Sequence, residues 1–219
     1  MKHISRPNIP RFAFFILPIL FLGFSLYWFA TVFLPVVFLE TQYQYRQVLL
    51  EVFHTTSLRG IFIPEFRVDL RGRAAQHNVN GIYIPKVQVD AEIIYNVDPN
   101  DQNAYTAALK KGIAHASGTA LPDSGGLGYY FAHSTTPNLV AQYNAVFYLL
   151  GKLEKGDDVF VWHQGKRFMY KVTEKSLTDP SDVSFLQKTY EEETIVLQTC
   201  WPPGTTVKRM LVFAERVEE

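Results

Sequence analysis

The sequence predicts a mainly β domain, a closed barrel or a sandwich with a few short helices, preceded by one N-terminal transmembrane helix. Two observations predict the β domain: most apolar runs after residue 81 are short, and residues typical of turns separate them. A third predicts the helix. Residues 12–39 contain no charged side chain, and a membrane-spanning helix needs about 20 mostly apolar residues.

Charge asymmetry around residues 12–39 predicts the orientation of this helix. Lys2, Arg6 and Arg11 precede the segment and Glu40 follows it, which places the N-terminus in the cytoplasm and the remainder outside. A cleaved signal peptide is the alternative. The apolar stretch is longer than a typical signal core, however, and no Ala-x-Ala site ends it, so we expect an uncleaved signal anchor.

The chain is expected to divide into four parts, listed in order: a cytoplasmic N-terminus (1–11), a transmembrane signal anchor (12–39), a juxtamembrane stalk or connector (40–80) and an extracytoplasmic domain (81–219). Within the connector, residues 41–53 show helical spacing of apolar side chains. The localisation predicted is therefore a cell membrane, crossed once.

Apolar periodicity and turn residues predict the elements of the domain in order. They are a strand-rich stretch (82–95), a helix that starts after the turn 98–101 and has its C-cap at Gly112, a short strand (129–132), a helix from Pro137 to near Gly151, a hairpin (157–163 with 167–172) closed at Gln164-Gly165, a polar connection (176–193), and strand-like runs at 194–200 and 210–214.

Composition excludes several classes of function. The formal net charge is +0, so the chain lacks the basic surface of a nucleic-acid-binding protein. No Gly-rich phosphate loop or His-Glu-x-x-His helix is present, and a single cysteine cannot form an intrachain disulfide. Acidic residues in 179–193 lack the spacing of an EF-hand, so we predict no metal and no other cofactor.

Cys200 is the only cysteine, and it ends a strand-like run that a Pro-Pro-Gly turn follows. Arg209 opens the next run, and antiparallel strands joined by a tight turn bring their facing ends together. Neighbours on a strand point to opposite faces, so only one of Lys208 and Arg209 can face the thiol. His133 ends another strand-like run. A thiolate nucleophile, a histidine and a cation suffice for acyl transfer.

These residues resemble the sortases, membrane-anchored bacterial cysteine transpeptidases, from about Gly81 to Val217. The sortase nucleophile motif reads Thr-Leu-x-Thr-Cys, with an arginine at the start of the next strand; this chain has Val196-Leu-Gln-Thr-Cys200 and Arg209. Upstream it has Gly112-Ile-Ala-His115-Ala-Ser-Gly118-Thr-Ala-Leu-Pro122 and then Ala132-His133-Ser134. It departs from the family pattern at Val196 and at Ala132, where a threonine and a glycine are usual.

The resemblance implies an eight-stranded sortase barrel with Cys200 as nucleophile, His133 as general acid and Arg209 as the oxyanion-stabilising cation. It also implies a substrate pocket shaped by residues 176–192. Further residues are predicted to bind substrate: Thr199, Trp201, Ser134 and His115. Trp201 fits a rigid turn as well as a groove wall, and His115 fits a structural role as well as a groove-lining one.

The implied reaction cleaves a C-terminal sorting motif of a secreted protein through a thioacyl-enzyme. The acyl group is then transferred to an amine, from a cell-wall peptide or a pilin lysine. Two alternatives stay open: a secreted cysteine hydrolase or peptidase that uses the same three residues, and a non-catalytic membrane-anchored β domain. Asp98-Pro99 is followed by Asn100 and not by an aromatic residue. This favours wall anchoring, or a pilus-type enzyme without a lid.

Overall fold

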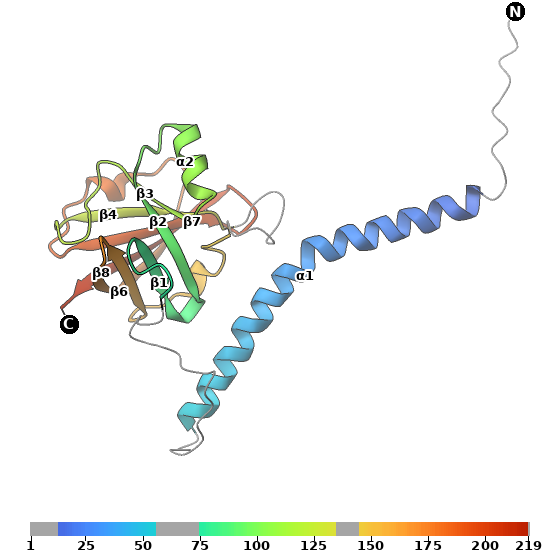
Figure 1. The fold of residues 1–219 in the computed structure, drawn as a ribbon, viewed down its shortest axis with the longest axis horizontal. Coiled ribbons are helices and arrows are strands. Elements are labelled where there is room, and N and C mark those ends of the chain that lie inside the picture. Colours follow the sequence, from blue (N-terminus) through green and yellow to red (C-terminus); the bar gives the residue numbers. More distant parts are fainter. Residues whose placement is uncertain (1–12, 56–74, 135–144, 219) are drawn as a thin grey trace, which may run out of the picture. The chain divides into compact units, whose positions relative to one another are not determined.

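The computed structural model describes residues 13–55, 75–134 and 145–218 (Figure 1). The chain divides into two compact units, residues 1–56 and 57–219. The predicted cytoplasmic residues, residues 56–74 of the connector and the first part of the helix expected from Pro137 lie outside the described residues.

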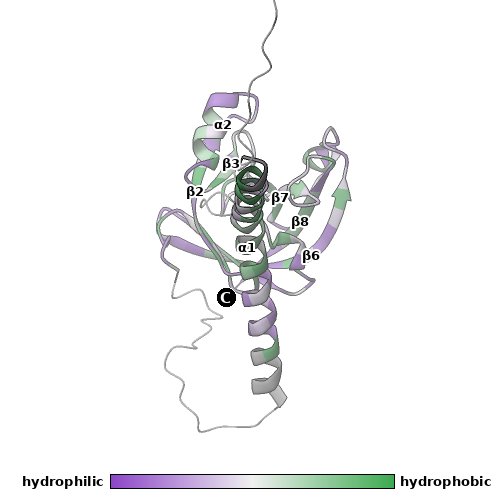
Figure 2. Cartoon of the chain, turned by 90° about the vertical axis from the view of Figure 1, so that its right-hand side faces the viewer, coloured by the Kyte–Doolittle hydropathy of each residue, from purple (hydrophilic) through white to green (hydrophobic). Residues whose placement is uncertain are grey.

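The described part of the first unit is a single helix, α1, Ala13–Thr55. It does not end near Leu39 but continues through residues 41–53, where the sequence predicted helical spacing. Large apolar side chains between Ile16 and Phe38 are exposed, among them Leu17 at 70% and Phe21 at 73%. Figure 2 colours the chain by hydropathy and shows green, hydrophobic residues along α1. Within the described residues, no helix combines the length and the apolarity that a membrane span requires.

The second unit is a closed barrel of eight strands in the order β1-β2-β3-β4-β7-β8-β6-β5 (Figure 1). The strands are β1 Gly81–Ile84, β2 Val89–Val97, β3 Ile113–Ala116, β4 Leu127–Phe131, β5 Asp158–His163, β6 Lys166–Thr178, β7 Thr194–Trp201 and β8 Lys208–Val217. The pairs β2–β3 and β4–β7 are parallel, and the other pairs are antiparallel. The sequence-based expectation of a mainly β closed barrel is thus confirmed.

Short helices join some of the strands: α2 Gln102–Leu109, and three 3-10 helices, η1 Pro85–Val87, η2 Leu150–Lys152 and η3 Ser184–Gln187. Asp101 caps α2, because its side chain accepts hydrogen bonds from the backbone N–H groups of Asn103 and Ala104. The described end of the helix expected from Pro137 is a turn followed by η2.

The β5–β6 hairpin closes at Gln164-Gly165, as predicted. Both residues have positive φ, 52° and 80°, as a two-residue type I′ turn requires. Gly112, in contrast, is not the C-cap of α2, whose C-cap is Lys110. Gly112 lies so close to β2 that a Cβ there would come within 2.2 Å of the Glu92 carbonyl oxygen. The glycine is needed for this close approach of two backbones.

Successive side chains of each strand alternate between the barrel interior and its outer face. The interior holds the main hydrophobic cluster, which includes Tyr130 of β4, Leu197 of β7 and Val212 of β8. Their strand neighbours Tyr129, Val196 and Phe213 belong to a second cluster, built around Phe185 of η3. The segment 179–193 therefore covers part of the outer face of β4, β7 and β8.

Residues 75–80, which the sequence assigned to the connector, contact the barrel. The backbone N–H groups of Gln76 and His77 donate to the Asp90 carboxylate at 2.7 and 3.3 Å, and the N–H of Gly165 donates to the Val79 carbonyl at 2.9 Å. Ala75 packs with buried aromatic side chains of β5. The packed structure thus begins before Gly81.

Candidate active site

Three strand ends bring Cys200, His133 and Arg209 together. The antiparallel register of β7 and β8 places Cys200 directly opposite Arg209. The parallel register of β4 and β7 pairs Phe131 with Gln198, and the Ala132 N–H continues the ladder by donating to the Gln198 carbonyl at 3.1 Å. His133 comes two residues after Phe131, and Cys200 comes two residues after Gln198. His133 and Cys200 therefore lie side by side at the ends of their strands.

The pleat of the sheet puts all three side chains on the outer face. On β7, Leu197 points to the interior, and Cys200 points to the opposite, outer face together with Val196. On β8, Arg209 lies on the same outer face as Phe213. His133 follows Ala132, which is buried in the interior cluster. The thiol, the imidazole and the guanidinium thus open on the face that the segment 179–193 partly covers.

Backbone contacts hold the His133 segment although β4 ends at Phe131. The Phe147 N–H donates to the His133 carbonyl at 3.1 Å. The Thr199 hydroxyl is 2% exposed and donates to the Ala132 carbonyl at 2.9 Å. Partial burial lowers the pKa of His133 below that of a free imidazole. At neutral pH the ring is therefore neutral and able to accept a proton.

Arg209 and Lys208 have different surroundings. Arg209 Nη1 donates to the Thr206 and Lys208 carbonyls at 3.3 and 3.4 Å, which hold the guanidinium near the β7–β8 turn. Lys208 lies opposite Trp201 in the register, on the other strand face, and forms an ion pair with Asp179 at 2.6 Å. Of the two cations, Arg209 is the one on the face of the thiol.

Two of the residues predicted to bind substrate are buried beneath the site. Thr199 and Ser134 are both 2% exposed, and Thr199 points to the barrel interior. Trp201 is half-buried, and its ring packs on Gly151 so closely that a Cβ there would meet it at 2.8 Å. Among these three residues, Trp201 alone offers surface to a ligand.

His115, also predicted to contact substrate or to be structural, is 0% exposed and lies on β3. Its Nε2 lies 2.9 Å from the Ala120 carbonyl oxygen, and its ring packs between Tyr95 and Tyr130. Burial lowers its pKa. This histidine is part of the core and presents no surface to a substrate.

Sequence reasoning missed a polar pair beside the thiol. The Tyr129 hydroxyl donates to Gln198 Oε1 at 2.7 Å, and both side chains are half-buried. Tyr129 lies four positions before His133 and Gln198 two positions before Cys200, on the same strand faces. The alternation of strand side chains could have placed them near the site, but not in contact with each other.

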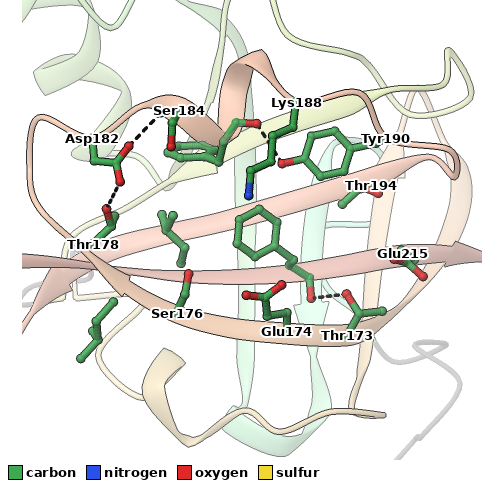
Figure 3. Close-up of a pocket in the computed structure, with 14 residues that line it drawn as sticks. Thr173, Glu174, Ser176, Thr178, Asp182, Ser184, Lys188, Tyr190, Thr194 and Glu215 are labelled. Carbon is green, nitrogen blue, oxygen red and sulfur yellow. Dashed lines mark hydrogen bonds between the residues drawn. The ribbon is translucent and has the colours of Figure 1, made fainter.

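A pocket of about 340 Å³ lies under the segment 179–193, against the outer face of β6 and β8 (Figure 3). Its apolar lining residues are Leu177, Phe185, Leu211 and Phe213. Asp182 accepts hydrogen bonds from the Thr178 hydroxyl and the Ser184 N–H, which hold the start of the covering segment. Leu211 is two residues after Arg209 on the same strand face, so the pocket adjoins the three-residue site.

The described part of the chain contains no group of three or more His, Cys, Asp or Glu side chains arranged to hold a metal ion. The chemistry that the site itself offers is nucleophilic. A half-buried thiol, a neutral imidazole and a fixed cation share one face, and they can carry an acyl group through a covalent intermediate.

Comparison with known proteins gives one consistent result. A family model described as a sortase domain matches residues 82–217. Sortase D of Bacillus subtilis is 28% identical over 137 residues, which cover 61% of this chain and 61% of that protein. Sortase SrtE1 of Streptomyces coelicolor is 34% identical over 110 residues, covering 46% and 30% respectively. The matches thus span less than two thirds of either relative.

The solved structures that are similar to this chain include several sortases. A lid mutant of sortase A from Corynebacterium diphtheriae has a TM-score of 0.55 and 26% identity, covering 68% of this chain and 75% of that one. Sortase C-1 from Actinomyces oris has the same TM-score and identity, covering 74% and 86%. Sortase C from Clostridium perfringens has a TM-score of 0.52 and 26% identity, covering 64% and 70%.

Proposed function

This chain belongs to the sortase family, and we propose that it is a cysteine transpeptidase. Its acyl donors are secreted proteins with a C-terminal sorting motif, and its acceptor is an amine. The observation that carries the proposal is the position of Cys200 opposite Arg209 and beside His133, on the face that adjoins a pocket.

In the first step the Cys200 sulfur, as thiolate, attacks the carbonyl carbon of the scissile amide. Before the attack, the thiol proton passes to His133. The lowered pKa of His133 keeps its ring neutral at pH 7 and therefore able to accept this proton. The carbonyl oxygen becomes an oxyanion, and Arg209 with a backbone N–H stabilises it. As the C–N bond breaks, His133 gives its proton to the leaving amine, and a thioester remains on Cys200.

In the second step an acceptor amine attacks the thioester carbonyl. The amine nitrogen loses a proton to His133, the C–S bond breaks, and the thiolate leaves with a new amide in place. One amide is exchanged for another, so no ATP is required. The acyl half of the donor must stay bound between the two steps, and the pocket under the segment 179–193 is its proposed binding place.

We further propose that the enzyme is a single-pass membrane protein with its N-terminus in the cytoplasm and its barrel outside. The uncharged residues 12–39, the preceding basic residues and the exposed apolar side chains of α1 support this proposal. Enzyme and membrane-bound precursor then share one surface, which raises their effective concentration. Protease added to spheroplasts should digest the barrel, and its protection would contradict the orientation.

The full-length protein in detergent provides the test of activity. It is incubated with peptides that end in Leu-Pro-x-Thr-Gly-like sequences, with and without an added amine such as triglycine. Mass spectrometry should find an acyl adduct on Cys200 and, with the amine, a ligated product. The Cys200→Ala variant should form neither. Cleavage by the Ala variant at more than trace rate would contradict the mechanism, and cleavage without ligation would favour a hydrolase.

A further inference from the structure

A short segment, residues 147–153, contacts the chain at both His133 and the residue that follows Cys200. At the start of the segment, the Phe147 N–H donates to the His133 carbonyl at 3.1 Å. Near its end, Gly151 packs against the ring of Trp201, which is the last residue of β7 and the direct neighbour of Cys200. Because one segment makes both contacts, its position influences the separation of the imidazole and the thiol.

The segment 147–153 is itself anchored to the barrel. Phe147, Leu150 and Leu153 are each 0% exposed and belong to the interior cluster. The Leu150 N–H donates to the Phe147 carbonyl at 3.2 Å, and the Leu153 N–H donates to the Leu150 carbonyl at 3.1 Å. From β6, Lys175 Nζ donates to the Gly151 and Leu153 carbonyls at 2.7 and 2.8 Å. Moving the segment away from the barrel would break these contacts.

Gly151 leaves no room for a side chain under the indole. A Cβ at this position would lie 2.8 Å from Trp201 Cζ3 and 3.1 Å from Trp201 Cη2, whereas carbon atoms in contact are about 3.5–4.0 Å apart. The φ of Gly151 is not positive, so the backbone conformation does not require glycine. The indole also packs against the interior cluster. Residue 151 therefore determines how far the end of β7 can approach the segment 147–153.

We propose that Gly151 and Trp201 are positioning residues of this enzyme. The Trp201 indole, wedged between Gly151 and the interior cluster, holds the end of β7 and with it the Cys200 sulfur. The segment that carries Gly151 also holds His133 through the carbonyl of that residue. The contact thus sets the distance over which the thiol proton passes to the imidazole. This inference rests on the proposed transpeptidase function and adds residues that act through Cys200.

The central experiment compares Gly151→Ala in two backgrounds of the full-length protein. With Trp201 present, the added methyl must displace the indole by about 1 Å, and kcat for ligation to triglycine should fall by about 10- to 10²-fold. The donor KM should change little, because the pocket is lined by neither residue. Trp201→Phe lacks the two ring atoms that the methyl meets. In that background, Gly151→Ala should change kcat by at most about twofold.

A milder variant tests the same contact if Gly151→Ala does not fold. Lys175→Met keeps the length of the side chain and removes the ammonium that donates to the Gly151 and Leu153 carbonyls. The segment 147–153 then loses one anchor, and kcat should fall several-fold. Lys171→Met is the matched control, because Lys171 lies on the same strand and pairs with Asp158 instead. It should leave kcat unchanged, and an equal loss in both variants would overturn the inference.

Labelling of Cys200 with a methanethiosulfonate reagent gives a second readout that needs no donor peptide. The thiolate is the species that reacts, so a thiol displaced from His133 should be labelled several-fold more slowly. Slower labelling in Gly151→Ala that the added Trp201→Phe restores supports the inference. The same loss of kcat and labelling in both backgrounds overturns it, as does no loss in either. No ligated product from the wild type contradicts the proposed function, and the labelling rates then still decide the inference.

Discussion

Replacing Thr199 by valine separates a role in positioning from a role in binding substrate. The sequence assigned Thr199 to substrate binding, but in the structure it is 2% exposed and donates to the Ala132 carbonyl at 2.9 Å. Valine has nearly the same shape and lacks the hydroxyl. The variant therefore loses one contact between the nucleophile strand and the residue that precedes His133.

The size of the effect follows from that contact. A buried carbonyl left without a partner costs about 1–3 kcal/mol. For a unit the size of residues 57–219, each kcal/mol corresponds to about 2–4 °C in Tm, so the Tm should fall by about 2–12 °C. A catalytic group misplaced by about 1 Å can cost about 10²-fold, so kcat should fall by about 10- to 10²-fold. KM should change little.

Thr199→Ser is the matched variant, because it keeps the hydroxyl and removes a methyl group. Loss of a buried methyl costs about 1 kcal/mol, so its Tm should also fall, but its kcat should stay near that of the wild type. The assays are thermal unfolding and steady-state ligation. A Val variant with a raised KM and an unchanged kcat and Tm would restore the substrate-binding role. An equal kcat loss in Ser and Val would attribute the effect to packing.

Three further outcomes are expected. Arg209→Lys should lower the ligation rate by about 10²–10³-fold, because an ammonium does not reproduce the planar fork of a guanidinium. Lys208→Ala should cost at most about 1 kcal/mol of stability, since the ion pair of Lys208 is largely exposed. A larger loss of ligation rate in Lys208→Ala than in Arg209→Lys would contradict the role of Arg209 as an oriented cation. Burial lowers the pKa of both His133 and His115. Below about pH 6.5 the unfolded chain then binds protons that the folded chain does not, so the urea-unfolding free energy should fall as the pH drops from 6.5; a pH-independent value would contradict this. A chain that starts at Gly81 should melt below one that starts at residue 57, because it lacks residues 75–80, which contact the barrel; equal Tm values would show that they add no stability.

Local patterns predicted the features that depend on neighbouring residues. Two turn residues, Gln164 and Gly165, specify the β5–β6 hairpin, and the turn after Cys200 brings Arg209 back to face it. These contacts close short loops, so the sequence near each turn determines them. The same kind of signal identified Asp101 as a helix start, and the structure shows its side chain capping α2.

Other features depend on residues distant in the sequence. The parallel pairing of β4 with β7 joins segments more than sixty residues apart, and no local pattern specifies which strands become neighbours. The Tyr129–Gln198 contact follows from that pairing, so the sequence could not predict it. Residues 113–116 were missed as a strand because all four are buried and show no alternation.

Strand β7 explains why the nucleophile motif serves both fold and function. Its inward residues Leu197 and Thr199 pack in the interior and tie the strand to β4. Its outward residues Gln198 and Cys200 lie on the outer face, on the same side of the strand as Val196. A substitution at an inward position therefore lowers the stability of the barrel. It changes the reaction rate only indirectly, by displacing His133. A substitution at an outward position acts on the site first, because neither Gln198 nor Cys200 belongs to the interior cluster. The alternation of a single strand thus separates positions that pack in the core from positions that form the candidate active site.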